Sequence, residues 1–384
     1  MLPLPALLAL TTTVFLGCLT EVLPAGLLLG MSADLGVSPS ATGQLVTVYA
    51  ITAALTAIPL TTMTLRVSRK RLLLALIVGF LVTNLLIAVS SSYPLILAAR
   101  VVSGALTGVM WSLVAGYAMR LAPPALIGRA LAVAMSGTPI GFALGVPAGT
   151  ALGELADWRW AFAAMALITV PLLVWVLVAV PALPGEPAGP TRPLAASRLP
   201  GMRPVLATVA LFSLGHNVAY TYIGPVLAGM DVAGMLGAAL LVFGCATVGG
   251  LVAVGAALDH RPRVVLMVCT GLTGAAIVLM GLSDGVHGLV LLAAALWGLA
   301  FGGAPTAFQA VTALIAGPTA DAAQSLTIAA WNGAVAGGAL VGGVLLPLGT
   351  SLLPWCAAFV VLLPLLFSRR VVLSAPADQC PTRR

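Results

Sequence analysis

The sequence predicts an all-α membrane protein with twelve transmembrane helices in two six-helix bundles. Hydrophobic residues make up 61% of the 384 residues, and charged residues only 7%. Soluble domains carry roughly 45–50% apolar and about 25% charged residues, so this chain has too little polar surface to face water. Apolar runs long enough to cross a bilayer recur along the chain, and basic residues gather between alternate runs.

Each predicted helix is an uninterrupted apolar run of about 20 residues, the length that crosses the hydrocarbon layer. The runs do not alternate as strands do, and open sheets cannot lie in lipid. Most connections between the runs are short. The twelve runs cover residues 5–29, 42–64, 71–90, 94–118, 128–152, 160–180, 203–227, 234–257, 263–282, 287–312, 322–346 and 350–368.

One connection differs from the others. Residues 181–200 read PALPGEPAGPTRPLAASRLP, a proline-rich stretch that cannot form a span. This stretch divides the chain into two halves whose sequences are similar, since aligning Gly104 with Gly298 also aligns Gly108 with Gly302. Two similar halves predict that one bundle rocks against the other about a central site. The predicted parts are a first bundle over 1–180, a cytoplasmic linker over 181–202, a second bundle over 203–368 and a cytoplasmic tail over 369–384.

The distribution of charge predicts the orientation in the membrane. With the N-terminus in the cytoplasm, 15 of the 17 Lys and Arg residues fall in the inner loops and the tail. The outer loops then hold Arg159 and five acidic residues. By the positive-inside rule, both termini are expected in the cytoplasm of a multi-pass plasma (inner) membrane protein. The same distribution explains the net charge of +7 without a nucleic-acid partner.

Two charged residues lie inside the predicted spans, Glu21 in the first and Arg100 in the fourth. A charge at a helix centre costs roughly 2.5–3.5 kcal/mol on insertion scales, which makes both residues candidates for function. A carboxyl group in an apolar cavity binds protons readily, so Glu21 is the predicted proton-coupling residue. Arg100 would bias a nearby carboxyl or an anionic substrate group. The alternatives are a structural ion pair, or an Arg100 side chain that extends to the outer interface.

Polar and aromatic residues at membrane depth predict a cavity for amphipathic molecules, with interhelical hydrogen bonding and interfacial aromatics as the alternative. The sequence predicts no metal site, because the histidine of the seventh span, His216, has no second potential ligand at suitable spacing.

The five cysteines show no paired spacing of the kind that indicates a disulfide or a metal site. Walker, GxSxG and HExxH motifs are absent, so no cofactor and no enzyme activity are expected. The cavity candidates are Trp111, His216, Asn217, Tyr220, Tyr222, Gln309, Trp331 and Asn332.

Glycines line one face of the fifth span. Such a face lets a neighbouring helix approach closely, which predicts tight packing. A second interpretation is that the same face is a sliding or hinging surface between the two bundles. The glycines recur at every fourth position and are Gly137, Gly141, Gly145, Gly149 and Gly153, with Pro139 and Pro147 among them.

Short segments along almost the whole chain are similar to those of a known family. They are TEVLPAGLL (20–28), DLGVS (34–38), GQLVTVYA (43–50), RVVSG (100–104), SGTPIGFALGVPAG (136–149), DWRWAF (157–162), YTYIGPVL (220–227) and WGLAFGGAP (297–305). With them the chain resembles the major facilitator superfamily, specifically its twelve-span drug:proton antiporter group. The branch that it resembles contains arabinose-efflux-like and chloramphenicol-resistance-like exporters.

The resemblance implies roles for individual residues. The family's fourth-helix motif R-x-x-x-G corresponds to Arg100 and Gly104, which implicates Arg100 in proton coupling. Glu21 corresponds to a first-helix acid that is common in the branch. The family's antiporter motif in the fifth helix implies exchange rather than uptake, and it corresponds to Gly141, Gly145, Pro147 and Gly149.

The resemblance also implies a cytoplasmic gate built from two loops. The family's signature G-x-L-a-D-r-x-G-r-k falls on residues 61–70, where Arg66, Arg69 and Lys70 match it. Its glycines and aspartate are replaced there, so the resemblance does not carry the family's usual charge lock over to the first-half loop. The second-half loop matches the signature better, with Gly255, Asp259, Arg261 and Arg263.

The sequence therefore predicts a proton-driven exporter of small apolar or amphipathic molecules, including antibiotics. Export of sugars or other metabolites is the alternative within the same class, because the resembled branch contains both. Few residues of the kind that bind carbohydrates line the spans, which favours drugs. A non-transporting receptor would be expected to carry a sizeable soluble domain, and passive diffusion would leave Glu21 without a role. The expected partners are a small-molecule substrate, protons and the lipid bilayer, and the chain is expected to be monomeric.

Overall fold

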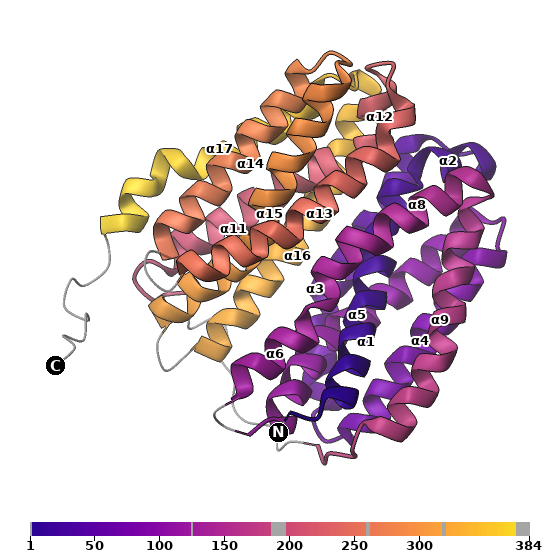
Figure 1. Ribbon diagram of the computed structural model, residues 1–384, viewed down its shortest axis with the longest axis vertical. Coiled ribbons are helices and arrows are strands. Elements are labelled where there is room, and N and C mark those ends of the chain that lie inside the picture. The colour runs from indigo at the N-terminus through magenta and orange to yellow at the C-terminus, as the bar shows by residue number, and fades with distance from the viewer. Residues whose placement is uncertain (1, 124–125, 186–196, 259–261, 317–319, 374–384) are drawn as a thin grey trace.

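The computed structural model describes residues 2–123, 126–185, 197–258, 262–316 and 320–373. These residues form helices joined by short connections. Figure 1 shows them in two groups, the first indigo to magenta and the second pink to yellow. The predicted all-α fold class is confirmed.

The described residues of the first group form ten helical elements. They are α1 (Leu4–Gly26), α2 (Leu28–Leu35), α3 (Pro39–Thr64), α4 (Arg69–Val89), α5 (Tyr93–Leu121), α6 (Ile127–Met135), α7 (Gly137–Ile140), the π-helical turn η2 (Gly141–Gly145), α8 (Val146–Leu155) and α9 (Trp158–Ala179). Side chains cap two of these helices. The Ser38 hydroxyl accepts a hydrogen bond from the Ala41 N–H where α3 begins, and the Asp157 carboxylate accepts one from the Arg159 N–H where α9 begins.

The second group has the same succession of helices. Its elements are α11 (Met202–Tyr220), α12 (Ile223–Ala228), η3 (Ala233–Met235), α13 (Leu236–Leu258), α14 (Pro262–Leu282), α15 (His287–Ala316), α16 (Ala320–Leu345), η5 (Leu346–Leu348) and α17 (Leu352–Leu373). In the described part of the chain, ten helices are long and apolar enough to cross a membrane. The broken pair α11–α12 and the helix α17, with a shorter apolar stretch over Leu352–Leu366, occupy the two remaining positions.

Matched glycine contacts relate the two groups to each other. A side chain at Gly104 of α5 would overlap the backbone of α3, and one at Gly298 of α15 would overlap the backbone of α13. One turn further on, Gly108 and Gly302 make the same two contacts. The second and fourth helices of each group therefore cross at the same point, as the aligned glycines predicted. The repeat in the sequence is thus a repeat in packing.

The two ends of the molecule differ in charge. At one end, named here the acidic end, Arg159 lies 2.6 Å from Asp34 and 3.6 Å from Asp157, and donates to the Ser90 carbonyl at 3.3 Å. These contacts hold together the connections α2–α3, α4–α5 and α8–α9 of the first group. At the opposite end, named here the basic end, Lys70 of α4 donates to the Leu177 carbonyl of α9 at 2.8 Å.

The two groups touch each other near the acidic end. The ring of Tyr222, between α11 and α12, occupies the space above Gly43 of α3 and beside Gly342 and Gly343 of α16. Its hydroxyl donates to the Ala339 carbonyl at 2.8 Å. Without glycine at these positions, the ring would collide with its neighbours. The contact seals α3, α11–α12 and α16 against one another at this end.

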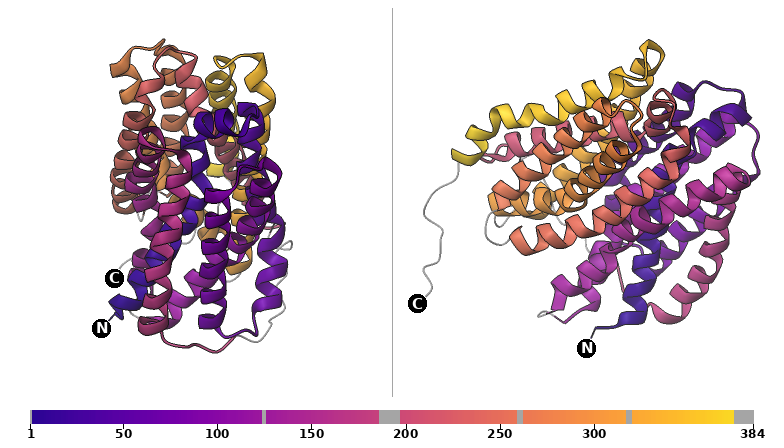
Figure 2. Two further views of the ribbon diagram at one scale, coloured as in Figure 1. Left: turned by 90° about the vertical axis from the view of Figure 1, so that its right-hand side faces the viewer. Right: turned by 45° about the horizontal axis from the view of Figure 1, so that its top comes forward.

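Toward the basic end the two groups separate. In Figure 1, α13 and the α6–α8 segment lie close together at the upper right and diverge toward the lower left. The tilted view in Figure 2 shows the same divergence. A methyl group at Gly116 of α5 or at Gly333 of α16 would meet open space. The protein is therefore in a conformation closed at the acidic end.

Candidate functional site

Arg100 is completely buried, and its guanidinium group joins three helices. From α5 its Nε donates to the Leu45 carbonyl of α3 at 3.0 Å. Its Nη1 donates to the Thr20 carbonyl of α1, and its Nη2 donates to the Glu21 carbonyl at 3.1 Å. The guanidinium also lies over the Tyr49 ring, 4.2 Å from its centroid. Arg100 thus fastens α5 to α1 and α3, and it does not extend to an interface.

Glu21 lies on α1 beside this arginine, and its side chain is half-buried. Its backbone carbonyl accepts from Arg100, but no ion pair within 4.0 Å joins its carboxylate to the guanidinium. Among the described residues no hydrogen bond occupies the carboxylate. The arginine charge is therefore nearby while the carboxyl oxygens remain open to a proton.

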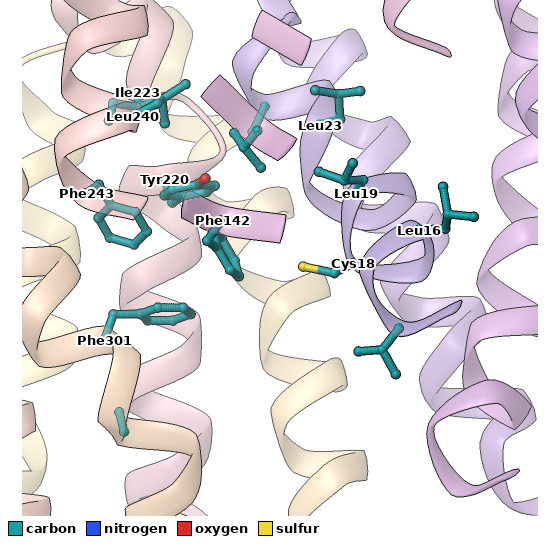
Figure 3. Packing of buried hydrophobic residues seen from close by; sticks show 14 of the residues in the cluster. Leu16, Cys18, Leu19, Leu23, Phe142, Tyr220, Ile223, Leu240, Phe243 and Phe301 are labelled. Atoms are coloured by element: carbon teal, nitrogen blue, oxygen red, sulfur yellow. The ribbon is translucent and has the colours of Figure 1, made fainter. Parts of the chain in front are cut away.

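An aromatic cluster lies where the two groups meet. We define it as Phe142 of η2, His216 and Tyr220 of α11, Phe243 of α13, and Trp297 and Phe301 of α15. Phe142 comes from the first group and approaches the rings of Tyr220, Phe243 and Phe301 edge-on, with centroids 5.4–5.9 Å apart. Edge-to-face pairs of this kind contribute about 0.5–1.5 kcal/mol each. Figure 3 shows Phe142 between these second-group rings and Cys18 of α1.

The π-helical turn determines where Phe142 points. Residues Gly141–Gly145 widen the fifth-span helix by one residue, a distortion that often marks functional sites. Gly244 of α13 packs directly on the backbone of Phe142 and Ala143, where any side chain would overlap the main chain. This close approach lets the Phe142 ring enter the aromatic cluster of the second group.

The aromatic cluster continues toward the basic end. Phe212, one turn before His216 on α11, stacks on Phe301 with centroids 6.4 Å apart. Trp331 of α16, half-buried, lies 6.0 Å from Phe301 and 6.2 Å from Phe308. Aromatic rings therefore extend from the seam between the groups toward the side on which the groups separate.

The predicted cavity residues do not all lie together. His216, Tyr220 and Trp331 belong to the aromatic cluster or its extension. Trp111 lies on α5 in the first group, Gln309 is exposed on α15, and Tyr222 lies in the acidic-end seam. Asn217 and Asn332 are buried and donate to the Ser213 and Ile328 carbonyls of their own helices.

The glycine row of the fifth span packs against α1, within the first group. Gly137 meets the Thr11 backbone, Gly141 meets Cys18, and Gly145 meets Leu19. The row continues through Gly149 and Gly153, which meet Leu23 and Leu27. The tight-packing prediction agrees with these contacts, whereas the interpretation as a surface between bundles is wrong. The seam between bundles uses the opposite side of the helix, where Phe142 and Ala143 meet Gly244.

The first-half gate loop is bound to its own group. The Arg69 guanidinium donates to the Leu65 carbonyl, and its backbone N–H donates to the Leu183 carbonyl at 3.0 Å. Arg66 is exposed. Of the second-half loop, Asp259 and Arg261 lie outside the described residues, while Arg263 lies at the start of α14 near Thr208 of α11.

Comparison with known proteins identifies the family. The model of the Major Facilitator Superfamily matches residues 10–323. The chain is a member of the major facilitator superfamily. It is therefore a transporter-family protein and not an enzyme.

This superfamily member is similar in sequence to two curated transporters and in structure to a third. It is 29% identical over 330 residues to a probable sugar efflux transporter of Mannheimia succiniciproducens, covering 84% of this chain and 82% of the relative. Identity and coverage are the same for the purine ribonucleoside efflux pump NepI of Salmonella paratyphi B. The structure of the nucleoside transporter NupG matches with a TM-score of 0.77 at 12% identity, over 97% of this chain and 100% of that chain. This last match shows the fold alone.

Sequence reasoning missed most of the aromatic cluster. Phe142, Phe243 and Phe301 lie inside apolar runs, where a phenylalanine resembles any lipid-facing residue. A usable signal was the spacing of Phe212, His216 and Tyr220, each four residues apart, which places them on one face of the helix.

Proposed function

We propose that this superfamily member exports small metabolites of the sugar or nucleoside type from the cytoplasm in exchange for protons. The observation that carries the proposal is the Glu21 carboxyl, which lies inside the membrane-spanning helix α1, about one turn from its C-terminal end, without a hydrogen-bond or ion-pair partner among the described residues. An ionised carboxyl inside a membrane span is costly, so such residues are rare and usually mark a proton or substrate pathway.

The arrangement around Glu21 suits exchange. Arg100 is held in place by three backbone carbonyls, so it supplies a fixed positive charge and does not follow the proton. Glu21 can therefore change its protonation state while its surroundings stay in place. The glycine-rich fifth helix matches the antiporter motif and packs on α1, the helix that carries Glu21. Glu21 would bind a proton from the acidic exterior and release it to the cytoplasm when substrate binds for export.

The class of substrate rests on the relatives. Those named above export sugars and purine ribonucleosides, which supports the metabolite alternative over the antibiotics that the sequence first suggested. We therefore place metabolites first and keep antibiotics as the competitor in the test below.

The orientation follows from the charged ends. Arg66, Lys70 and Arg120 lie at the basic end and Asp34 and Asp157 at the acidic end, so the positive-inside rule places the basic end in the cytoplasm. The conformation described here would then be open toward the cytoplasm, ready to receive a substrate for export.

The topology can be tested by labelling single cysteines in intact cells, in a background free of the five native cysteines. A cysteine at Asp231, in the α12–α13 connection, should react with an impermeant maleimide from outside. Cysteines at Arg192 and Arg370 should react only after the cells are opened. Arg192 lies outside the described residues, and Arg370 is near the end of α17. External labelling at position 192 would reverse the orientation.

The export function can be tested in inside-out membrane vesicles. Their lumen corresponds to the cell exterior, so an acidic lumen should drive accumulation of an exported substrate. The probes are labelled inosine, arabinose and chloramphenicol. We expect accumulation of at least one metabolite that collapses when a protonophore is added. Protonophore-insensitive accumulation would contradict proton coupling, and accumulation of chloramphenicol alone would restore the antibiotic assignment.

A further inference from the structure

We infer that His216 and Tyr220 form the polar part of the substrate site, and that they recognise a flat heteroaromatic ring carrying a hydrogen-bond acceptor. This inference rests on the proposed export function and narrows its substrate class. Sugars lack such a ring, whereas nucleobases and similar heterocycles have one.

The hydrogen bond from Trp297 fixes the state of the His216 ring. The indole Nε1 of Trp297 donates to Nδ1 of His216 at 3.0 Å. An indole N–H can only donate, so Nδ1 must be the unprotonated nitrogen and Nε2 must carry the hydrogen. A second proton on Nδ1 would point at the indole N–H. The ring is therefore held neutral, with a single donor at Nε2.

That donor and the neighbouring hydroxyl have no hydrogen-bond partner in the described part of the chain. Trp297 is the one hydrogen-bond partner that the described residues give to the His216 ring. The Tyr220 hydroxyl is buried and has no partner among the same residues. Both side chains are only 3% exposed. Buried polar atoms are nearly always hydrogen-bonded, so the buried Tyr220 hydroxyl without a partner, one turn from the open His216 donor, indicates that a ligand supplies the partner.

The surroundings define the shape of that ligand. The His216 and Phe301 rings stack with centroids 4.0 Å apart and 14° between their planes, and Tyr220 lies nearly parallel to His216 at 5.2 Å. Around these rings are Phe142, Phe243 and Trp297. A sugar carries a hydroxyl on nearly every carbon, and two polar groups of the cluster are open among the described residues, so these rings suit the base of a nucleoside and not its ribose. A flat ring with one or two polar atoms matches this composition.

The position of the site fits a transported ligand. Phe142 comes from the first group and the other five rings come from the second, so the aromatic cluster lies at the seam that opens and closes during transport. A heteroaromatic ring bound beside Tyr220 would replace contacts that Phe142 makes in the conformation described here. Binding would then act directly on the contact between the two groups.

Two substitutions of His216 separate recognition from packing. His216→Asn can keep an acceptor near Nδ1 for Trp297, but its side chain ends short of Nε2. His216→Gln can place an amide N–H near Nε2. In inside-out vesicles with labelled inosine, we expect KM close to the parent value for His216→Gln and raised about tenfold for His216→Asn, the size of one lost hydrogen bond. If the Asn variant keeps the parent KM and the Gln variant loses it, His216 serves Trp297 and the inference is wrong.

A second variant tests the hydroxyl and does not depend on the histidine. Tyr220→Phe removes an oxygen to which the described residues give no partner, so folding and expression should be unchanged. The KM for inosine should nevertheless rise about tenfold. The control is Tyr117→Phe, which removes a hydroxyl bound to the Pro181 carbonyl at the basic end, far from the aromatic cluster. An unchanged KM in Tyr220→Phe would overturn the role of this hydroxyl in recognition.

The parent protein separates failure of this inference from failure of the proposed function. Proton-driven accumulation of inosine supports both. Proton-driven accumulation of arabinose but not of inosine leaves the export function standing and overturns the heteroaromatic class. If neither probe is accumulated under a proton gradient, the proposed function fails and the inference fails with it.

Discussion

Replacing Glu21 by glutamine should abolish accumulation of substrate against a gradient and leave only downhill exchange. Glutamine has the shape of the protonated acid, and no hydrogen bond to the carboxylate is lost among the described residues. Folding should therefore survive. Binding of neutral substrates should survive too, because it does not depend on the charge. The variant cannot bind and release a proton at this position, so the pH gradient can no longer drive substrate transport.

The measurement is flux into proteoliposomes with an imposed pH gradient, compared with counterflow at equal pH. Asp284→Asn is the control, because it removes an acidic group from the turn between α14 and α15, where asparagine tolerates the positive φ of 41°. Parent-like uphill transport by Glu21→Gln would show that Glu21 is structural and that protons couple elsewhere.

Gly104→Ala should destabilise the protein strongly, although it adds a single methyl group. That methyl would overlap the carbonyl oxygen of Tyr49 on the facing helix α3. A backbone cannot rotate away as a side chain can, so α3 and α5 must move apart. Overpacking of this kind costs about 1–3 kcal/mol. The shift would also pull Arg100 from the Leu45 carbonyl. We expect a lower melting temperature and loss of transport.

The same helix offers a matched control. Gly116→Ala changes the same residue type in α5, at a position where a methyl group meets open space. Its melting temperature and transport should stay near the parent values. Thermal unfolding in detergent and vesicle transport, measured on both variants, decide the point. Equal behaviour of the two variants would mean that α3 and α5 are not packed as described.

The all-α fold class and the order of the long helices could be predicted from the sequence, because a bilayer requires long apolar runs, and ten of the twelve predicted spans are long apolar helices in the described part of the chain. What the runs could not reveal were changes inside them. The seventh span is interrupted at Thr221 and Tyr222, and the fifth contains a π-helical turn at Gly141–Gly145. Both lie within apolar sequence, where the local propensity of the chain does not distinguish a regular helix from a distorted one.

Site residues could be predicted from the sequence only where their residue type differs sharply from that of their sequence neighbours. Glu21 and Arg100 were found because a charge inside an apolar run is rare and costly. The neighbours of the glycine row were not found, since glycines show that a face is bare and not which helix covers it. Phe142 was missed for a related reason: its role depends on Gly244, more than 100 residues away.

The hydrogen bonds of Arg100 to three backbone carbonyls affect which sequence changes this protein tolerates. Its acceptors are main-chain oxygens of Thr20, Glu21 and Leu45, and every amino acid supplies the same atom. The residue types at positions 20 and 45 can therefore change without loss of the hydrogen bonds to Arg100, provided that the backbones of α1 and α3 stay in place. An alanine scan would therefore detect the donor and none of its acceptors. Partners of this arginine would leave no trace as covarying pairs in a family alignment, and only backbone-level changes, such as an ester replacing the following amide, would expose them.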